Sequence, residues 1–240
     1  MQRAKLGHMS DEQPPPRPAT RRERYRLDTT AEAKSLALAQ LAEGGVGALS
    51  LNAIAREMGM TGPALYRYVG SRDNLLTELI VDTYTDFGNT LWLAVEQSGD
   101  RPAPDRVRAV GQAYRDWSVA NPQPYLLIFG TPIPGYQAPG DGRTTTAAQR
   151  ALSALLTVVA GLDPGPLPTH EEIDRECQAW AEHAGAPALP GRLLRFAVTM
   201  WTRLHGVMSL EIAGHFDPAL PGGHLFYTAE LDDMLRPWPC

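Results

Sequence analysis

The sequence predicts an all-α protein with a small N-terminal domain of three helices and a larger C-terminal helical bundle. Three observations lead to this fold class. Apolar residues recur at helical spacing along most of the chain, no stretch shows the period of two expected of a β-strand, and glycine or proline interrupts nearly every gap between helical stretches. At 240 residues and 43% hydrophobic composition, the chain has enough apolar residues for a real core.

Residues 1–28 are expected to form a flexible basic arm. Four prolines disfavour a helix there, and few apolar residues are available for burial. The prolines are Pro14, Pro15, Pro16 and Pro18, and the arginines that follow are Arg17, Arg21, Arg22, Arg24 and Arg26. The first helix is expected to begin at Thr29 or Thr30, residue types that cap helices, and to end at Gly44 and Gly45.

Two short helices and one long helix are expected next. Leu51, Ile54, Ala55 and Met58 have the spacing of one buried helical face, and Gly59 ends that helix. A third helix opens with Thr61 as its cap and Pro63 in its first turn, where a missing N–H does no harm. Ser71 caps a fourth helix that reaches about Gln97. The domain boundary is expected inside this fourth helix, which gives domains at 29–76 and 77–240.

The rest of the chain also predicts helices. Their expected ranges are 104–120, 123–130, 144–161, 169–184, 189–214 and 224–235. The longest loop, 131–143, is rich in proline and glycine and is expected to be mobile.

The spacing of three residues within 50–69 is that of a helix-turn-helix. A small residue is needed where the two helices approach, and Ala55 is small. A residue that tolerates positive φ is needed four positions later, and Gly59 meets this demand. An aliphatic residue must then return to the shared core, and Leu65 is placed for it. This arrangement is typical of proteins that bind double-stranded DNA.

Residues 30–76 resemble the N-terminal domain of the TetR family of bacterial regulators. The matching positions are Ile54, Ala55, Gly59, Leu65, Tyr66, Tyr68, Val69, Arg72 and Leu75. Val69 replaces the usual Phe and Arg72 the usual Lys, which keeps the charge. The resemblance implies a homodimer that binds operator DNA and carries an effector pocket in its C-terminal domain. It also implies that the last two long helices, 189–214 and 224–235, form a four-helix dimer interface.

The third helix is the expected recognition helix, and its first two turns are expected to enter the major groove. The candidate DNA-binding residues are Thr61, Gly62, Pro63, Ala64, Tyr66, Arg67 and Tyr68 on this helix, with Ser50, Asn52 and Arg72 near helix N-termini. Simpler roles stay open for some of them. The alternative for Tyr68 is core packing, and for Arg67 it is a solvated side chain. The alternative for Asn52 is a residue that touches nothing, and for Ser50 it is a helix cap without a DNA contact.

The charge distribution fits this arrangement. The net charge is −5, but residues 1–72 hold 11 Lys and Arg against 7 Asp and Glu, whereas residues 73–240 hold 11 against 20. A basic head on an acidic body presents one end to phosphates. The alternative is that an N-terminal arm is basic by chance.

The C-terminal bundle carries aromatic residues suited to an apolar pocket. The candidate ligand-binding residues are Tyr114, Trp117, Tyr125, Phe129, Trp180, Trp201 and His205. Plain core packing is the alternative for each of them. No cluster of lysine or arginine indicates an anionic ligand such as an acyl-CoA, so the expected ligand is mostly apolar. Arg115, Arg192 and Arg195 leave an anionic ligand as the alternative. The loop 131–143 is expected to act as the lid of this pocket.

Trp201, His205 and Gly206 resemble the WHG motif of one group of TetR C-terminal domains. Trp201 and His205 are four residues apart and share one helix face. The resemblance places this region beside the pocket and the dimer interface, and Gly206 is expected to allow close packing of another helix. The alternative for His205 is a core histidine with its hydrogen bonds satisfied within the chain.

Other classes of protein find less support. His170, Glu171, Glu172 and Cys177 make a weak metal site, and no nucleophile setting indicates an enzyme, so no cofactor is expected. No signal-peptide core and no run of ~18 apolar residues is present, so no membrane association is expected. Cys177 and Cys240 do not form a CxxC pair, which favours a reducing, cytoplasmic setting.

The sequence therefore predicts a transcriptional repressor that a small, largely apolar ligand releases from a pseudo-palindromic operator. Two alternatives remain within the same fold: a DNA-binding regulator without an effector, and an activator.

Overall fold

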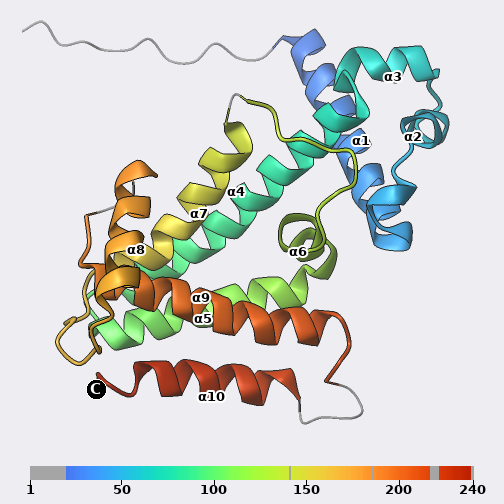
Figure 1. Ribbon diagram of the computed structural model, residues 1–240. Helices are drawn as coiled ribbons and strands as arrows, with labels where there is room; N and C mark the ends of the chain where they lie inside the picture. The colour runs from blue at the N-terminus through green and yellow to red at the C-terminus, as the bar shows by residue number, and fades with distance from the viewer. Residues whose placement is uncertain (1–19, 141, 185, 187, 217–221, 239–240) are drawn as a thin grey trace, which may run out of the picture.

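The computed structural model describes residues 20–140, 142–184, 186, 188–216 and 222–238, and these residues are helical with connecting turns and contain no strand (Figure 1). The elements in chain order are α1 (Arg21–Gly44), the 3-10 turn η1 (Val46–Ala48), α2 (Leu51–Glu57), α3 (Gly62–Val69), α4 (Arg72–Ser98), α5 (Ala103–Ala120), α6 (Pro122–Phe129), α7 (Arg143–Val159), α8 (Glu171–His183), α9 (Gly191–Ile212) and α10 (Gly223–Leu235). The predicted all-α fold class is confirmed.

The expected flexible arm is wrong for residues 21–28, because α1 begins eight residues earlier than the sequence predicted. Thr20 caps the helix: its hydroxyl accepts from Glu23 N, and the Glu23 carboxylate accepts from Thr20 N at 2.7 Å. This reciprocal capping box satisfies two backbone donors at the helix start. The Glu23 carboxylate has a pKa below its usual value because the Thr20 backbone N–H donates to it. Residues 1–19 of the expected arm lie outside the described residues.

The buried apolar residues form two clusters. The head core joins α1, α2, α3 and the first two turns of α4 around Ile54, Leu65 and Leu76. The body core joins α4, α5, α6, α7, α8, α9 and α10. Both cores share α4, whose Leu75 and Leu79 belong to the head and whose Phe87 and Leu91 belong to the body.

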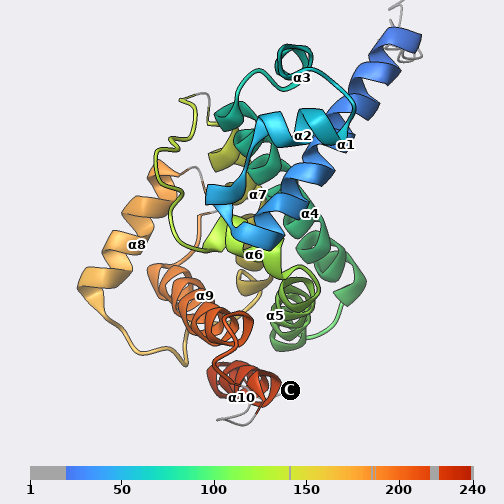
Figure 2. The same ribbon diagram turned by 90° about the vertical axis from the view of Figure 1, so that its right-hand side faces the viewer.

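The helices of the body form layers below the head (Figures 1 and 2). α4 packs along α7 and against α5, while α9 lies between α8 and α10. α10 buries Tyr227, Leu231 and Met234 against α5 and α9. The connection from α6 to α7 contains no helix or strand at 131–140 and 142, as the sequence predicted.

Candidate DNA interface and ligand cavity

The helix-turn-helix spacing has the geometry that the sequence predicted. Ala55 and Leu65 are buried, with exposed fractions of 1% and 0%. Gly59 makes the turn at φ 64°, a conformation that a residue with a Cβ rarely adopts. Met60 N then donates to Ala55 O at 2.7 Å, which closes the end of α2. The tight turn therefore rests on Gly59 and sets α3 across α2.

Gly62 and Asn52 lie against each other at the start of α3. A Cβ at position 62 would stand 2.9 Å from Asn52 Oδ1. The absent side chain of Gly62 therefore lets the exposed Asn52 lie over the first turn of α3. Asn52 thus contacts Gly62 within the head. Gly62 therefore has a packing role in addition to leaving the surface of α3 without a side chain at this position.

The recognition helix presents several of the expected residues to solvent. Thr61 occupies the N-cap position, but its hydroxyl makes no capping hydrogen bond and Thr61 is exposed. Pro63 lies in the first turn as expected, and Tyr66 and Arg67 are exposed. Ala64 is half-buried. These side chains are available to a partner on the outer face of α3.

Tyr68 has a packing role. It is half-buried against the head core, and its ring meets that of Tyr25 edge-to-face at 6.5 Å. Tyr25 lies in the first turns of α1, which the sequence did not predict to be helical. The extension of α1 is therefore anchored beside α3.

Ser50, Ser71 and Arg72 make contacts inside the head. The hydroxyl of Ser50 accepts from Ala53 N at 3.3 Å and caps α2. Ser71 caps α4 as expected, by accepting from Asn74 N at 3.0 Å. Arg72 Nε donates to Leu49 O at 3.4 Å.

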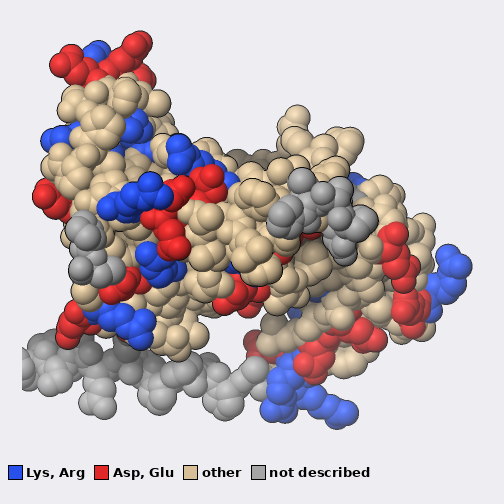
Figure 3. Space-filling view, turned by 90° about the horizontal axis from the view of Figure 1, so that it is seen from below, with Lys and Arg blue, Asp and Glu red and all other residues tan. Residues whose placement is uncertain are grey.

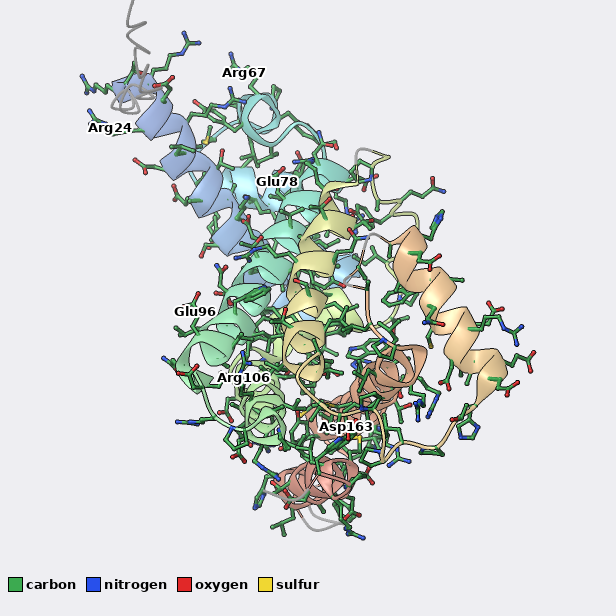
Figure 4. All side chains as sticks on the ribbon, turned by 90° about the vertical axis from the view of Figure 1, so that its left-hand side faces the viewer. Arg24, Arg67, Glu78, Glu96, Arg106 and Asp163 are labelled. Atoms are coloured by element: carbon green, nitrogen blue, oxygen red, sulfur yellow. The ribbon has the colours of Figure 1, made fainter. Side chains whose placement is uncertain are left out.

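Basic side chains from two helices lie at the head end of the molecule. Arg24 on α1 and Arg67 on α3 are found at that end in Figure 4. Arg21, Arg22 and Arg26 lie on the same exposed stretch of α1. On the opposite side, in the view from below that faces α10, basic and acidic side chains are interspersed (Figure 3). The unexpected extension of α1 thus adds arginines to the end that carries α3.

A cavity of about 270 Å³ lies in the body between α4, α5, α6, α7, α8 and α9. Four of the expected ligand-binding residues line it: Tyr114, Phe129, Trp180 and Trp201. Trp180 and Trp201 are also exposed, at 42% and 40%, as is Val198 beside them. The cavity therefore opens to solvent between α8 and α9.

Trp117, Tyr125 and His205 do not line this cavity, so the structure does not bring them together with the other four at its wall. Trp117 is buried against Phe87, with ring centroids 4.8 Å apart, and its Nε1 donates to Asp86 at 2.7 Å. Tyr125 is 1% exposed. These residues form the packing behind the cavity wall.

His205 has its hydrogen bonds within the chain. Its Nδ1 lies 3.0 Å from the Tyr125 hydroxyl and 3.3 Å from the Tyr114 hydroxyl, and its Nε2 lies 3.3 Å from Ser209 Oγ. Burial lowers the pKa of His205, because the charged imidazolium loses solvation there. Burial also raises the pKa of Tyr114 and Tyr125, so both hydroxyls stay protonated.

The Trp201–His205 pair has the geometry expected for residues four apart on a helix. The two rings stack with centroids 5.3 Å apart and an angle of 24°. Gly206 packs against nothing in the described part of this chain, since a Cβ there would meet no atom within 4 Å. The close helix contact expected at Gly206 is therefore not made by the described residues.

Sequence reasoning missed the cavity residues that α4 contributes. Tyr84, Phe87 and Leu91 line the wall and are spaced three and seven residues apart, so they share one face of α4. That spacing is visible in the sequence, but the predicted ligand-binding residues begin only at Tyr114. The other residues that were not expected are Val110, Gly111, Ala148, Ala151, Leu152, Leu155, Leu156, Ala197, Val198, Met200 and Leu204.

The expected lid over the pocket is wrong. No described residue of 131–143 lines the cavity. Ile133 and Tyr136 pack against the head core instead. The apolar side chains of this loop are drawn to the apolar surface of the head, which the sequence pattern could not reveal.

Neither a membrane-spanning helix nor a metal cluster is found in the described part of the chain. No helix there has the length and apolar character needed to cross a membrane. Within the same residues, no group of three or more His, Cys, Asp or Glu is placed to hold a metal ion. Cys177 is a free thiol, and Cys240 lies outside the described residues.

Two protein-family models match the chain. The model described as "Bacterial regulatory proteins, tetR family" matches residues 35–79, and the model described as "Tetracyclin repressor-like, C-terminal domain" matches residues 107–234. The first covers the helix-turn-helix, and the second covers most of the body.

Curated proteins and solved structures give the same result. HTH-type transcriptional regulator Rv1816 of Mycobacterium tuberculosis is 36% identical over 183 residues, which are 74% of this chain and 77% of that one. The crystal structure of regulatory protein SCO4313 has a TM-score of 0.78 and 41% identity, and the match covers 90% of this chain and 100% of that one. The TetR family transcriptional regulator PfmR from Thermus thermophilus shares the fold, with a TM-score of 0.54 and 17% identity over 88% of this chain and 99% of that one.

The family models, the curated relatives and the helix-turn-helix geometry agree on one assignment. This chain belongs to the TetR family of bacterial transcriptional regulators, which are DNA-binding proteins and not enzymes.

Proposed function

We propose that this regulator is a repressor that a small, largely apolar ligand releases from a pseudo-palindromic operator. The observation that carries the proposal is the position of α4. One end of this helix packs in the head core, and Tyr84, Phe87 and Leu91 on the same helix line the cavity. A ligand that prefers one body shape therefore biases the direction of α4 and with it the placement of α3.

The lining of the cavity supports an apolar, uncharged ligand. Its residues are aliphatic, aromatic, methionine or glycine, and none of them carries a formal charge. An ionic group would be desolvated there without an opposite charge to offset the loss. Apolar burial at about 25 cal/mol per Å² is the available driving force, and Trp180 and Trp201 provide flat surfaces for an aromatic ligand.

The DNA contacts are assigned to the outer face of α3. Thr61, Ala64 and Arg67 are placed for base edges, and Tyr66 for phosphate, with Gly62 and Pro63 giving a low surface. Ser50, Asn52, Tyr68 and Arg72 support the head and remain candidates for backbone contacts. The exposed arginines in the first turns of α1 extend this basic surface.

A homodimer is part of the proposal, because two heads are needed to read a pseudo-palindrome at half-sites roughly 34–36 Å apart. We assign the interface to the outer faces of α8 and α9, which expose Trp180, Val198 and Trp201. Val198 and Gly206 are eight residues apart, so the uncovered Gly206 lies on the same stripe of α9. α10 stays part of the proposed interface, because Leu225 and Phe226 on it are 56% and 43% exposed, whereas its Tyr227, Leu231 and Met234 are buried inside the chain.

The remaining assignments follow from this function. A regulator of chromosomal DNA acts in the cytoplasm, and the proposal requires no cofactor. The domain limits 29–76 and 77–240 stay a prediction, and the described extension of α1 moves the proposed start of the head to residue 20. A regulator of the same fold without an effector, or an activator, is the alternative, and the open cavity favours the ligand-responsive form.

The test is an electrophoretic shift assay with DNA that flanks the protein's own gene. A probe of matching chemistry is N-phenyl-1-naphthylamine, an uncharged aromatic dye that is monitored by tryptophan quenching. We expect binding to the flanking DNA, quenching by the dye, and release of the DNA as the dye saturates. Duplex binding that survives deletion of residues 50–69 would contradict the DNA assignment. Retention of the operator by every compound that fills the cavity would contradict the ligand response, since a ligand that binds both shapes equally shifts nothing.

A further inference from the structure

The segment between α6 and α7 connects the cavity with the DNA-binding head. It leaves α6 at Phe129, runs toward the head, and returns to α7 at Arg143 (Figures 1 and 2). The structure describes residues 130–140 and 142 of this segment. Its path therefore brings it into contact with the cavity wall at one end and with the DNA-binding head at the other.

At the head, two side chains of this segment dock on the core. Ile133 and Tyr136 are partly buried and pack against the head cluster. The Tyr136 hydroxyl lies 2.9 Å from Thr77 Oγ1, and Thr77 is 2% exposed. Thr77 Oγ1 donates its own hydrogen to Asp73 O at 2.9 Å, so in the second bond the Tyr136 hydroxyl is the donor and Thr77 Oγ1 the acceptor. The loop is therefore held to α4 by a hydrogen bond that water does not reach easily.

Ion pairs next to this contact tie three helices together. Arg143, at the start of α7, donates to Glu78 on α4 at 2.6 Å. Lys34 on α1 reaches Glu78 at 3.3 Å and Asp82 at 2.7 Å. Burial alone would raise the pKa of Glu78, but the hydrogen bonds from Arg143 and Lys34 outweigh it and keep the pKa below its usual value. The docked loop thus lies beside a charged contact between the head and α7.

At the other end, the segment begins in the cavity wall. Phe129 lines the cavity and meets Tyr84 and Phe87 edge-to-face at 6.0 Å and 5.6 Å. Tyr84, also in the wall, donates its hydroxyl to Ile128 O at 3.2 Å. Ile133 follows Phe129 by only four positions, so a displacement of Phe129 cannot be absorbed by a long slack chain.

We propose that Ile133 and Tyr136 are positioning residues that fix the head on the body and carry the state of the cavity wall, through Phe129, to α4 at Thr77. This inference rests on the proposed ligand response. A ligand that moves Phe129 pulls on a loop whose far end is bound to the head, so the recognition helix follows the body. Without the docked loop, the head keeps its fold but follows the body less closely. The two sites stay intact, and the coupling between them falls.

The first experiment measures coupling in the full-length protein. The coupling factor is the operator Kd with saturating N-phenyl-1-naphthylamine divided by the Kd without it, and values of roughly 5–150 are typical of allosteric proteins. We expect Tyr136→Phe and Thr77→Val each to lower this factor several-fold while dye affinity stays within twofold. The double variant should lower the coupling factor no further than either single variant does, because both substitutions remove the same hydrogen bond. Thr77→Ser, which keeps the hydroxyl, should restore coupling, and Gln137→Ala on the exposed part of the loop is the matched control.

The second experiment needs no ligand and separates this inference from the proposed function. Hydrogen exchange is compared between wild type, Tyr136→Ala, Ile133→Ala and Gln137→Ala. We expect faster exchange in α1 and in the first turns of α4 for the first two variants, with α9 unchanged. Equal exchange in all four proteins overturns the inference, whether or not the dye binds. If the dye releases DNA equally well from wild type and from the double variant, the inference is overturned while the proposed function stands.

Discussion

The head and the body are both built of packed helices, but their cores differ in the size of the side chains. The head core contains Ala33, Ala37 and Ala55 where helices approach, with leucines filling the space between them. The body core contains large rings, among them Phe87, Tyr114 and Trp117. Phe87 and Tyr114 are also part of the wall of the cavity of about 270 Å³, and no residue of the head core lines that cavity.

This difference fits the two tasks that the proposed function gives to the head and the body. A head that must present α3 in one orientation benefits from close contacts that allow no rearrangement. The proposed ligand response would require a body with space and with walls that have more than one arrangement. Residues on α4, Leu127 on α6, and Ile133 and Tyr136 on the loop that follows α6 join the two regions. Four substitutions test the comparison, from the largest expected effect to the smallest.

Leu65→Ala should destabilise the head by about 2–5 kcal/mol, because the side chain is fully buried and a close-packed core collapses poorly around a void. Urea unfolding followed by circular dichroism measures the loss, and operator binding should disappear with it. Leu27→Ala is the control, since Leu27 is 65% exposed and should change stability by less than about 0.5 kcal/mol. Similar effects for the two variants would contradict the assigned head core.

Ala197→Leu should fill part of the cavity. Ala197 is buried and lines the wall, so the larger side chain takes the space of the ligand. Forcing extra methylenes into a filled site costs about 1–3 kcal/mol, so we expect the affinity for N-phenyl-1-naphthylamine to fall by a similar amount. The variant should still bind the operator, and the dye should no longer release it. Ala120→Leu at the exposed C-terminal end of α5, away from the cavity wall and the proposed interface, is the matched control. Unchanged dye affinity in Ala197→Leu would place the ligand elsewhere.

Tyr66→Phe should weaken DNA binding by about 0.5–1.5 kcal/mol, since one exposed hydroxyl loses a phosphate contact. The loss should be equal for operator and unrelated duplexes, because phosphate contacts carry no sequence information. Thr61→Ala is the matched comparison and should instead change the preference among operator variants. Fluorescence anisotropy with both kinds of duplex separates the two results, and a sequence-dependent loss in Tyr66→Phe would reassign Tyr66 to base contact.

The smallest expected effect is a pH dependence at His205. Its pKa in the folded chain is lowered by burial, so between that value and about 6.5 the unfolded chain binds a proton that the folded chain does not. The free energy of unfolding should therefore decrease as the pH falls below about 6.5. His205→Gln should reduce this slope, which urea unfolding across the range from neutral to mildly acidic pH measures. An identical slope in the variant would show that other groups cause it.

Local patterns in the sequence determined the helices and the helix-turn-helix. The helical periods, the caps at Ser50 and Ser71 and the turn at Gly59 each act within a few residues, so their effect can be judged without the rest of the chain. The first turns of α1 were missed although their signal is also local. Thr20 and Glu23 have the spacing of a capping box, but the prolines before them and the second pair of threonines at 29–30 favoured a later start.

Only the tertiary structure decided which aromatic residues share a cavity and where the long loop docks. Tyr84 and Trp180 are 96 residues apart, and no local rule says that they face the same space. Three aromatic or imidazole side chains resemble those that line the cavity but form hydrogen bonds behind its wall. Trp117 bonds to Asp86, Tyr125 to Ser209, and His205 to tyrosine hydroxyls. Burial and hydrogen bonding between distant segments are set by how helices pack, and that packing depends on all the faces together.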